Sequence, residues 1–155
     1  MKSPMPIVKI KKITQSKCNI MLERLAQKIK NSKEKFDYIM GIENGGVNVS
    51  IPLGLSLKLP HKTIKISFYG DDKKPSETPI VDLRGHIFKE IDKVLLVDDL
   101  TDSGKTLEYF KNNFKCDHKV AVLFHNERFS TVIPEYYSEI KPYDKWIIFP
   151  WERNK

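Results

Sequence analysis

The hydrophobic residues of this chain follow two spacings, which predict helices and strands in alternation. Between residues 17 and 30, apolar positions recur every three or four residues, as on one face of a helix, and Ser16 is a candidate N-cap. Short, mostly apolar runs bounded by turn residues predict strands at 36–42, 94–97 and 119–124. This order is typical of a three-layer α/β domain with a largely parallel sheet of about five strands flanked by helices.

Three further segments extend this pattern. Residues 47–57 are small and apolar and predict a helix that Pro52 disturbs, and residues 63–69 alternate between polar and apolar as in a strand. The polar stretch 70–85 is too long for an ordinary connection and predicts a flexible lid loop. A chain of 155 residues with 40% hydrophobic residues predicts one domain, 1–155, with a core of its own.

The strongest candidate chemistry follows the apolar run 94–97. This run predicts a strand buried on both faces, so Asp98 and Asp99 are expected at its carboxyl end. The polar turn 101–106 then leads into a helix, and a helix N-terminus after a tight turn attracts anions because its N–H groups are unpaired. Adjacent carboxylates suit ribose hydroxyls or hydrated Mg²⁺. The stretch therefore predicts a site for a sugar phosphate.

A nucleotide-binding P-loop is the competing interpretation of the same turn. Gly104, Lys105 and Thr106 match the end of that motif, but it requires a glycine five residues before Gly104, where Asp99 stands. We therefore reject the P-loop.

The string from Val94 to Thr106 resembles the phosphoribosyl-pyrophosphate (PRPP) signature of the type I phosphoribosyltransferases: four apolar residues, two acids, two further residues, an acid, Ser-Gly, and a Thr two residues on. The resemblance implies that Asp98 and Asp99 hold the ribose diol and Mg²⁺, partly through the substrate. It implies that Asp102 faces the base as general acid or base. The 5′-phosphate site would comprise Thr101, Asp102, Ser103, Gly104, Lys105 and Thr106.

A second turn, Asn44-Gly45-Gly46, lies between the predicted strand 36–42 and the helix 47–57. Beside the PRPP signature it resembles the pyrophosphate-binding loop of the same family, in which an arginine often precedes the two glycines. Here Asn44 brings no charge. The lid residues Lys73, Lys74 and Arg84 are candidates to reach the pyrophosphate, and a solvated charged surface is the alternative.

The end of the chain, residues 126–155, is expected to form a small hood. The string Trp-Ile-x-x-Pro-Trp-Glu that starts at Trp146 resembles the C-terminal hood of bacterial-type xanthine/hypoxanthine-guanine phosphoribosyltransferases. The resemblance implies that Trp146 stacks on a purine and that the backbone at Ile147 reads the purine edge. Asn126 stands where relatives usually carry a lysine that donates to the purine 6-oxo group, while Trp151 is interpreted as a core residue.

Composition narrows the function less than these motifs do. The net charge of +7 suits a polyanionic ligand, nucleic acid or simple solubility, but no basic patch is interleaved with aromatic residues, so we expect no nucleic-acid binding. No apolar run approaches the roughly 18 residues that cross a membrane, and the N-terminus has no apolar signal core, so a cytoplasmic protein is expected. Cys18 and Cys116 lack metal or redox spacing.

The resemblance implies transfer of the 5-phosphoribosyl group from PRPP to a purine, with a 6-oxopurine favoured, Mg²⁺ as cofactor and pyrophosphate as product. It also implies a homo-oligomer, either dimer or tetramer. Two alternatives keep the fold: a PRPP-sensing regulator without transferase activity, because Asn44 and Asn126 replace charged residues, and a transferase for adenine or a pyrimidine.

Overall fold

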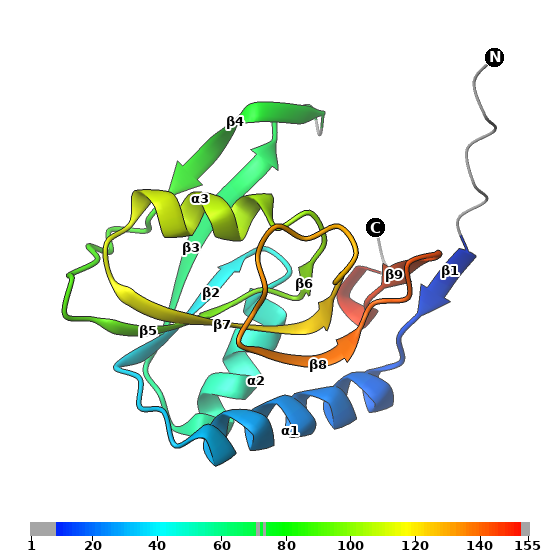
Figure 1. The fold of residues 1–155 in the computed structure, drawn as a ribbon, viewed down its shortest axis with the longest axis horizontal. Helices are drawn as coiled ribbons and strands as arrows, with labels where there is room; N and C mark the ends of the chain where they lie inside the picture. Colours follow the sequence, from blue (N-terminus) through cyan, green and yellow to red (C-terminus); the bar gives the residue numbers. More distant parts are fainter. Residues whose placement is uncertain (1–8, 71, 73, 153–155) are drawn as a thin grey trace.

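The computed structural model describes residues 9–70, 72 and 74–152, which form a seven-stranded sheet, a separate two-stranded sheet and three α-helices (Figure 1). The strand order in the large sheet is β4-β3-β2-β5-β7-β6, and β8 also pairs with β7. All its strand pairs are parallel except β3–β4, which is antiparallel. The predicted largely parallel sheet is confirmed, with seven strands rather than about five.

The elements follow one another along the chain in the order expected for an α/β fold. The helices are α1 (Gln15–Ser32), α2 (Val47–Leu57) and α3 (Lys105–Asn113). The strands of the large sheet are β2 (Tyr38–Glu43), β3 (His61–Tyr69), β4 (Pro75–Asp82), β5 (Lys93–Val97), β6 (Leu100–Thr101), β7 (Asp117–His125) and β8 (Tyr136–Ile140). The small sheet pairs β1 (Lys9–Lys12) with β9 (Lys145–Ile148), and the 3-10 turn η1 (Pro150–Glu152) follows.

The large sheet lies between two helical layers, with α1 and α2 on one face and α3 on the other (Figure 1). Alternate residues of β5 show both cores. Leu95 and Val97 pack in the cluster that contains α1 and α2, whereas Val94 and Leu96 pack in the cluster that contains α3. Burial on both faces explains why this strand is a continuous apolar run.

Two helix predictions have different outcomes. Helix α2 has the predicted bounds, with Pro52 inside it. Helix α1 begins earlier than predicted, because Thr14 rather than Ser16 is its N-cap: the Thr14 hydroxyl accepts from the Lys17 N–H at 3.0 Å. Ser16 therefore lies within the first turn.

The stretch 70–85 is not a loop throughout. It contains β4, which forms an antiparallel hairpin with β3. The regular alternation of apolar and polar residues that predicts a strand is weak in β4. The reason is that β4 is an edge strand whose residues are all exposed or half-buried. The lid candidate Lys73 lies outside the described residues.

The expected hood, 126–155, is also divided differently. Strand β8 belongs to the large sheet through its pairing with β7, so the hood proper consists of β9 and η1. The partner of β9 is β1, from the start of the described chain.

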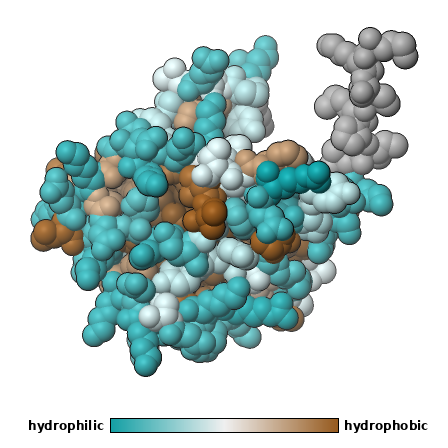
Figure 2. Space-filling view, viewed as in Figure 1, coloured by the Kyte–Doolittle hydropathy of each residue, from teal (hydrophilic) through white to brown (hydrophobic). Residues whose placement is uncertain are grey.

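The helices in the described part of the chain are too short or too polar to cross a bilayer. The molecular face in Figure 2 is mainly hydrophilic, with a few separate hydrophobic patches.

Candidate active site

The glycine turn after β2 packs directly on the acid pair after β5. A Cβ atom on Gly45 would stand 2.1 Å from Oδ2 of Asp99, and one on Gly46 would stand 2.6 Å from the carbonyl oxygens of both Ile42 and Val97. The turns meet because β2 and β5 are neighbouring parallel strands that end side by side. The structure thus brings the two sequence-predicted ligand turns into contact, at a spacing that only glycine permits.

The turn at residues 101–106, which we call the phosphate loop after its predicted ligand, leads into the N-terminus of α3. Its N-cap residue, Gly104, has φ +83° and no side chain to bond the first N–H groups of the helix. The Lys105 N–H donates to Ser103 Oγ at 3.3 Å, while the N–H groups of Thr106 and Leu107 have no acceptor within the described chain. Unpaired N–H groups at a helix start form an anion site.

A cavity of about 190 Å³ collects the predicted phosphate residues. Asp98 lines it together with all six predicted 5′-phosphate residues, namely Thr101, Asp102, Ser103, Gly104, Lys105 and Thr106. The side chain of Thr101 is not available to a ligand, because it is 1% exposed and its hydroxyl is hydrogen-bonded to His125 Nδ1 at 2.6 Å. Thr101 therefore anchors the loop through its side chain.

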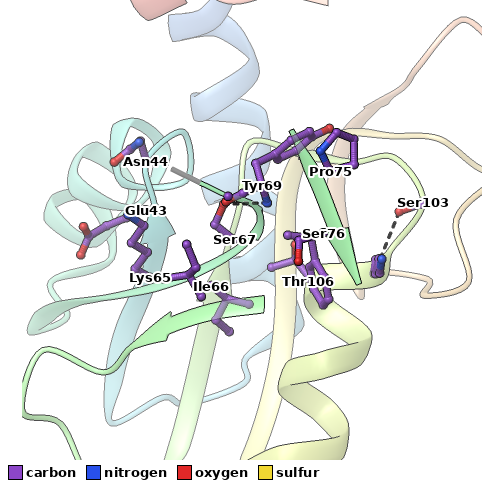
Figure 3. A pocket seen from close by; sticks show the side chains of 14 residues that line it. Glu43, Asn44, Lys65, Ile66, Ser67, Tyr69, Pro75, Ser76, Ser103 and Thr106 are labelled. Atoms are coloured by element: carbon purple, nitrogen blue, oxygen red, sulfur yellow. Dashed lines mark hydrogen bonds between the residues drawn. The ribbon is translucent and has the colours of Figure 1, made fainter. Parts of the chain in front are cut away.

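A larger cavity of about 640 Å³ adjoins this one and reaches the glycine turn (Figure 3). Figure 3 shows Asn44 of the glycine turn, Lys65 and Ser67 of β3, and Ser103 and Thr106 of the phosphate loop around the same space. The β3–β4 hairpin forms one side of the cavity. The hairpin is therefore a wall of the candidate site.

The basic side chains that line the larger cavity are not the lid residues predicted to reach the pyrophosphate. They are Lys65 on β3 and Lys105 at the start of α3. Lys105 Nζ lies 4.4 Å from the centre of the Phe68 ring, and Lys65 takes part in no ion pair formed within the described residues. Sequence reasoning missed Lys65, although the polar alternation of residues 63–69 places it on the same strand face as Ser67.

The lid candidate Arg84 is already engaged. Its guanidinium binds Glu43 through two hydrogen bonds of 2.6 and 2.9 Å and binds Asp82 at 3.0 Å. This pairing lowers the pKa of Glu43. Lys74 is exposed at the hairpin turn and lines neither cavity.

Asp102 lies exposed on the phosphate loop, with one oxygen held. Its Oδ1 accepts a hydrogen bond of 2.7 Å from Nδ2 of Asn126. Asn126 itself is 2% exposed. Its predicted contact with a purine stays a prediction, and in this structure its amide is directed at Asp102.

The hood residues stand apart from both cavities. Trp146 is 57% exposed on β9 and lines neither cavity, while the side chain of Ile147 is buried in the core and is not available to a ligand. Trp151 stacks on Phe149 with ring centres 4.6 Å apart, in agreement with its expected structural role.

With this geometry in place, comparison with known proteins decides the family. The sequence profile of the family described as "Phosphoribosyl transferase domain" matches residues 10–152. The chain belongs to this family. The match covers both cavities, the glycine turn and the hood.

Individual relatives agree with this assignment. The chain is 31% identical over 121 residues to a xanthine-guanine phosphoribosyltransferase of Desulfotalea psychrophila. This alignment covers 77% of this chain and 72% of that protein. It is 27% identical over 115 residues to the enzyme of the same name from Cereibacter sphaeroides, covering 74% and 68%. The crystal structure of a purine phosphoribosyltransferase from Pyrococcus horikoshii superposes with a TM-score of 0.76 at 30% identity, covering 94% and 95%. The expected type I fold and the expectation of an enzyme are confirmed.

The acid pair of this phosphoribosyltransferase resists ionisation. Both side chains are half-buried. Burial raises the pKa of Asp98 well above its usual range, and the negative charge of Asp99 raises it further. Burial likewise raises the pKa of Asp99 to about 6, with a further contribution from Glu152. The nearby Trp151 indole opposes this rise, although its N–H forms no hydrogen bond within the described residues. A cation bound beside the pair would offset this cost of ionisation.

These residues fit Mg²⁺ that is shared with a substrate. Within the described chain, no cluster of three or more His, Cys, Asp or Glu side chains could hold a metal alone. Asp98 and Asp99 supply the carboxylate oxygens that Mg²⁺ prefers, and protein-bound Mg²⁺ commonly takes its remaining ligands from water and substrate phosphates.

Proposed function

We propose that this enzyme transfers the 5-phosphoribosyl group from PRPP to a ring nitrogen of a purine base, with a 6-oxopurine favoured, and releases pyrophosphate. The contact between Gly45 and Asp99 carries the proposal. It joins a turn suited to pyrophosphate to acids suited to ribose, beside a helix start suited to phosphate. PRPP has these three parts in the same order, and the names of the relatives support a purine as acceptor.

The phosphate loop would hold the 5′-phosphate of PRPP. The first residues of α3 line the same cavity as Ser103 and Thr106, so the two hydroxyls and the helix dipole would act on one anion. Asp98 lines the same cavity and would bind the ribose hydroxyls. This arrangement fixes the sugar at the carboxyl edge of the sheet.

The pyrophosphate would occupy the larger cavity beside Asn44, Gly45 and Gly46. Asn44 brings no charge, so we assign the positive charge on this side to Lys65 from β3. Because Arg84 neutralises Glu43, the acid that lines this cavity does not cancel the attraction of Lys65 for an anion. Mg²⁺, where bound near Asp98 and Asp99, would supply charge neutralisation of the leaving pyrophosphate.

The base would lie between Asp102 and the hood. Asp102 is exposed and one oxygen of its carboxylate accepts no hydrogen bond from the described residues, so it suits a general acid or base at the purine imidazole nitrogen. Trp146 offers a face for stacking, and the backbone at Ile147 offers hydrogen bonds to the purine edge. We expect the working protein to be a cytoplasmic homo-oligomer.

The test is an incubation with PRPP and Mg²⁺ and, in turn, hypoxanthine, guanine, xanthine, adenine and a pyrimidine, with release of pyrophosphate as the readout. Turnover with a 6-oxopurine supports the proposal, and Asp102→Asn should then lose roughly 10² to 10⁴ in kcat. Turnover with adenine or the pyrimidine alone would replace the proposed acceptor. PRPP binding without turnover would point to a sensing protein instead.

A further inference from the structure

We infer that Asn126 is a positioning residue for the reaction, which fixes the carboxylate of Asp102 through a single hydrogen bond. The inference rests on the proposed function, since it assigns work to Asp102. It differs from the role that the sequence suggested, in which Asn126 touches the base itself. The observation behind it is a buried amide that joins two loops at the candidate site.

The hydrogen bonds of Asn126 determine the orientation of its amide. Nδ2 donates to Asp102 Oδ1 at 2.7 Å, while Oδ1 accepts from the backbone N–H groups of Arg128 and Phe129 at 3.2 and 3.3 Å. A carboxylate only accepts and a backbone N–H only donates, so exchanging the amide oxygen and nitrogen would break all three bonds. Asn126 thus needs both halves of an amide.

The backbone of Asn126 ties the same two loops together. Its N–H donates to the carbonyl oxygen of Thr101 at 2.8 Å, and its carbonyl oxygen accepts from the Ser130 N–H at 3.0 Å. Further along, the Thr131 N–H donates to the Ser103 carbonyl oxygen at 2.9 Å. Segment 126–131 therefore braces the phosphate loop on both sides of Asp102.

The Asn126 hydrogen bond acts on an otherwise free side chain. Asp102 is exposed, and the bond from Asn126 is the one hydrogen bond its carboxylate forms within the described residues. A general acid or base works within about 2.6–3.2 Å of the proton it moves, and a shift of about 1 Å can cost roughly 100-fold in rate. Holding Oδ1 leaves the other oxygen in a defined place for the base.

Burial explains why Asn126 suits this task better than contact with a ligand. At 2% exposure its side chain has little surface to offer a purine. The hydrogen bond from Asn126 to Asp102 is charge-assisted and partly buried. It is therefore stronger than an exposed hydrogen bond between neutral groups. A base approaching Asp102 would meet the carboxylate before the amide.

The test replaces one atom of the amide. Asn126→Asp keeps an oxygen for the N–H groups of Arg128 and Phe129, but sets a second carboxylate against Asp102. We expect kcat to fall roughly 10- to 100-fold, with the KM for PRPP and for the base within about twofold. Asn113→Asp, the same change at the far end of α3, should leave both unchanged. An unchanged kcat for Asn126→Asp, or a rise confined to the KM for the base, would overturn the inference.

A second measurement needs no turnover. In the double variant Asn126→Asp/Asp102→Asn, donor and acceptor exchange places and the hydrogen bond can re-form, so the Tm lost in Asn126→Asp should return. If Asn126→Asp does not fold alone, the double variant should fold and Asn126→Ser, too short to reach Asp102, should show the fall in kcat. No recovery in the double variant would refute the pairing. Absence of turnover by the unaltered enzyme would refute the proposed function, while the Tm cycle would still decide the pairing.

Discussion

The carboxyl edge of the large sheet and the hood, to which we assign different parts of the substrates, are built in opposite ways. At the sheet edge, Gly45 and Asp99 are packed so closely that a single Cβ atom does not fit between them. In the hood, Trp146 stands 57% exposed on a two-stranded sheet. The contrast indicates that the proposed sugar and phosphate site is preformed by packing in the fold, whereas the proposed base site depends on side chains presented at the surface.

The closest packing should give the largest effect. Gly45→Ala would put a Cβ atom 2.1 Å from Asp99 Oδ2 and force that carboxylate to rotate, so kcat/KM for PRPP should fall by roughly 100-fold or more with little change in Tm. Gly46→Ala meets backbone oxygens instead, which cannot move away, and should cost about 1–3 kcal/mol of stability. Measurement of kcat/KM and Tm for both variants checks this division. Gly45→Ala with unaltered kcat/KM would contradict a preformed edge.

The wall of the larger cavity should give the next largest effect. Lys65→Met removes the cation that we assign to pyrophosphate and should raise the KM for PRPP roughly 10-fold or more, since hydrogen bonds to charged groups contribute about 1.5–3 kcal/mol. Lys62→Met is the matched control, because Lys62 is an exposed residue of the same strand that does not line the cavity. An equal rise in the KM for PRPP in both variants would show that the positive charge of the protein attracts PRPP in general, and that Lys65 makes no specific contact with it.

The hood should respond more mildly and to the base alone. Trp146→Ala should raise the KM for the purine roughly 10-fold, as stacking on an aromatic ring contributes about 1–3 kcal/mol. The KM for PRPP should stay the same, and Tm should hardly change because the side chain is exposed. Trp146→Phe, which keeps an aromatic face, should restore most of the affinity. An equal rise in the KM for PRPP would contradict the separation of the two regions.

The smallest effect concerns stability without ligands. Burial raises the pKa of Asp99 from an ordinary 3.8 to about 6, so the folded state binds a proton that the unfolded state has lost. The contribution of this proton to the free energy of unfolding is fully present below about pH 4 and is lost as the pH rises through 6. Asp99→Asn should therefore be more stable than the unaltered enzyme at pH 8, by a few degrees in Tm, and the two should converge at pH 4. Thermal unfolding across this range gives the difference, and a constant difference would contradict a buried, protonated Asp99.

Sequence patterns were most informative where burial is strongest. The run Val94–Val97 predicted a strand with ligands at its carboxyl end, and the structure has β5 there with both faces covered. The sequence predicts the glycine turn, through its resemblance to a pyrophosphate-binding loop, and the phosphate loop as ligand turns, and the parallel pairing of β2 with β5 brings these two turns together. Central parallel strands leave a clear signal in sequence because their neighbours are apolar on both sides.

Prediction was weakest where a residue's role depends on a distant partner. The prediction of a loop over residues 70–85 misses strand β4, because β4 forms by pairing with β3 and has no regular apolar spacing of its own. Arg84 looked free in sequence, but Glu43, 41 positions away, holds it. The bond between Asn126 and Asp102 joins residues 24 positions apart and is visible only in three dimensions.

The pairing of β1 with β9 has a consequence for how the protein is made. Residues 9–12 are among the first described residues to leave the ribosome, yet their strand partner, residues 145–148, leaves among the last. Until β9 has been synthesised, the main-chain groups of β1 have no strand to pair with, and the sheet that carries Trp146 cannot form. The small sheet that presents Trp146 therefore forms only after every element from α1 to β8 has been synthesised.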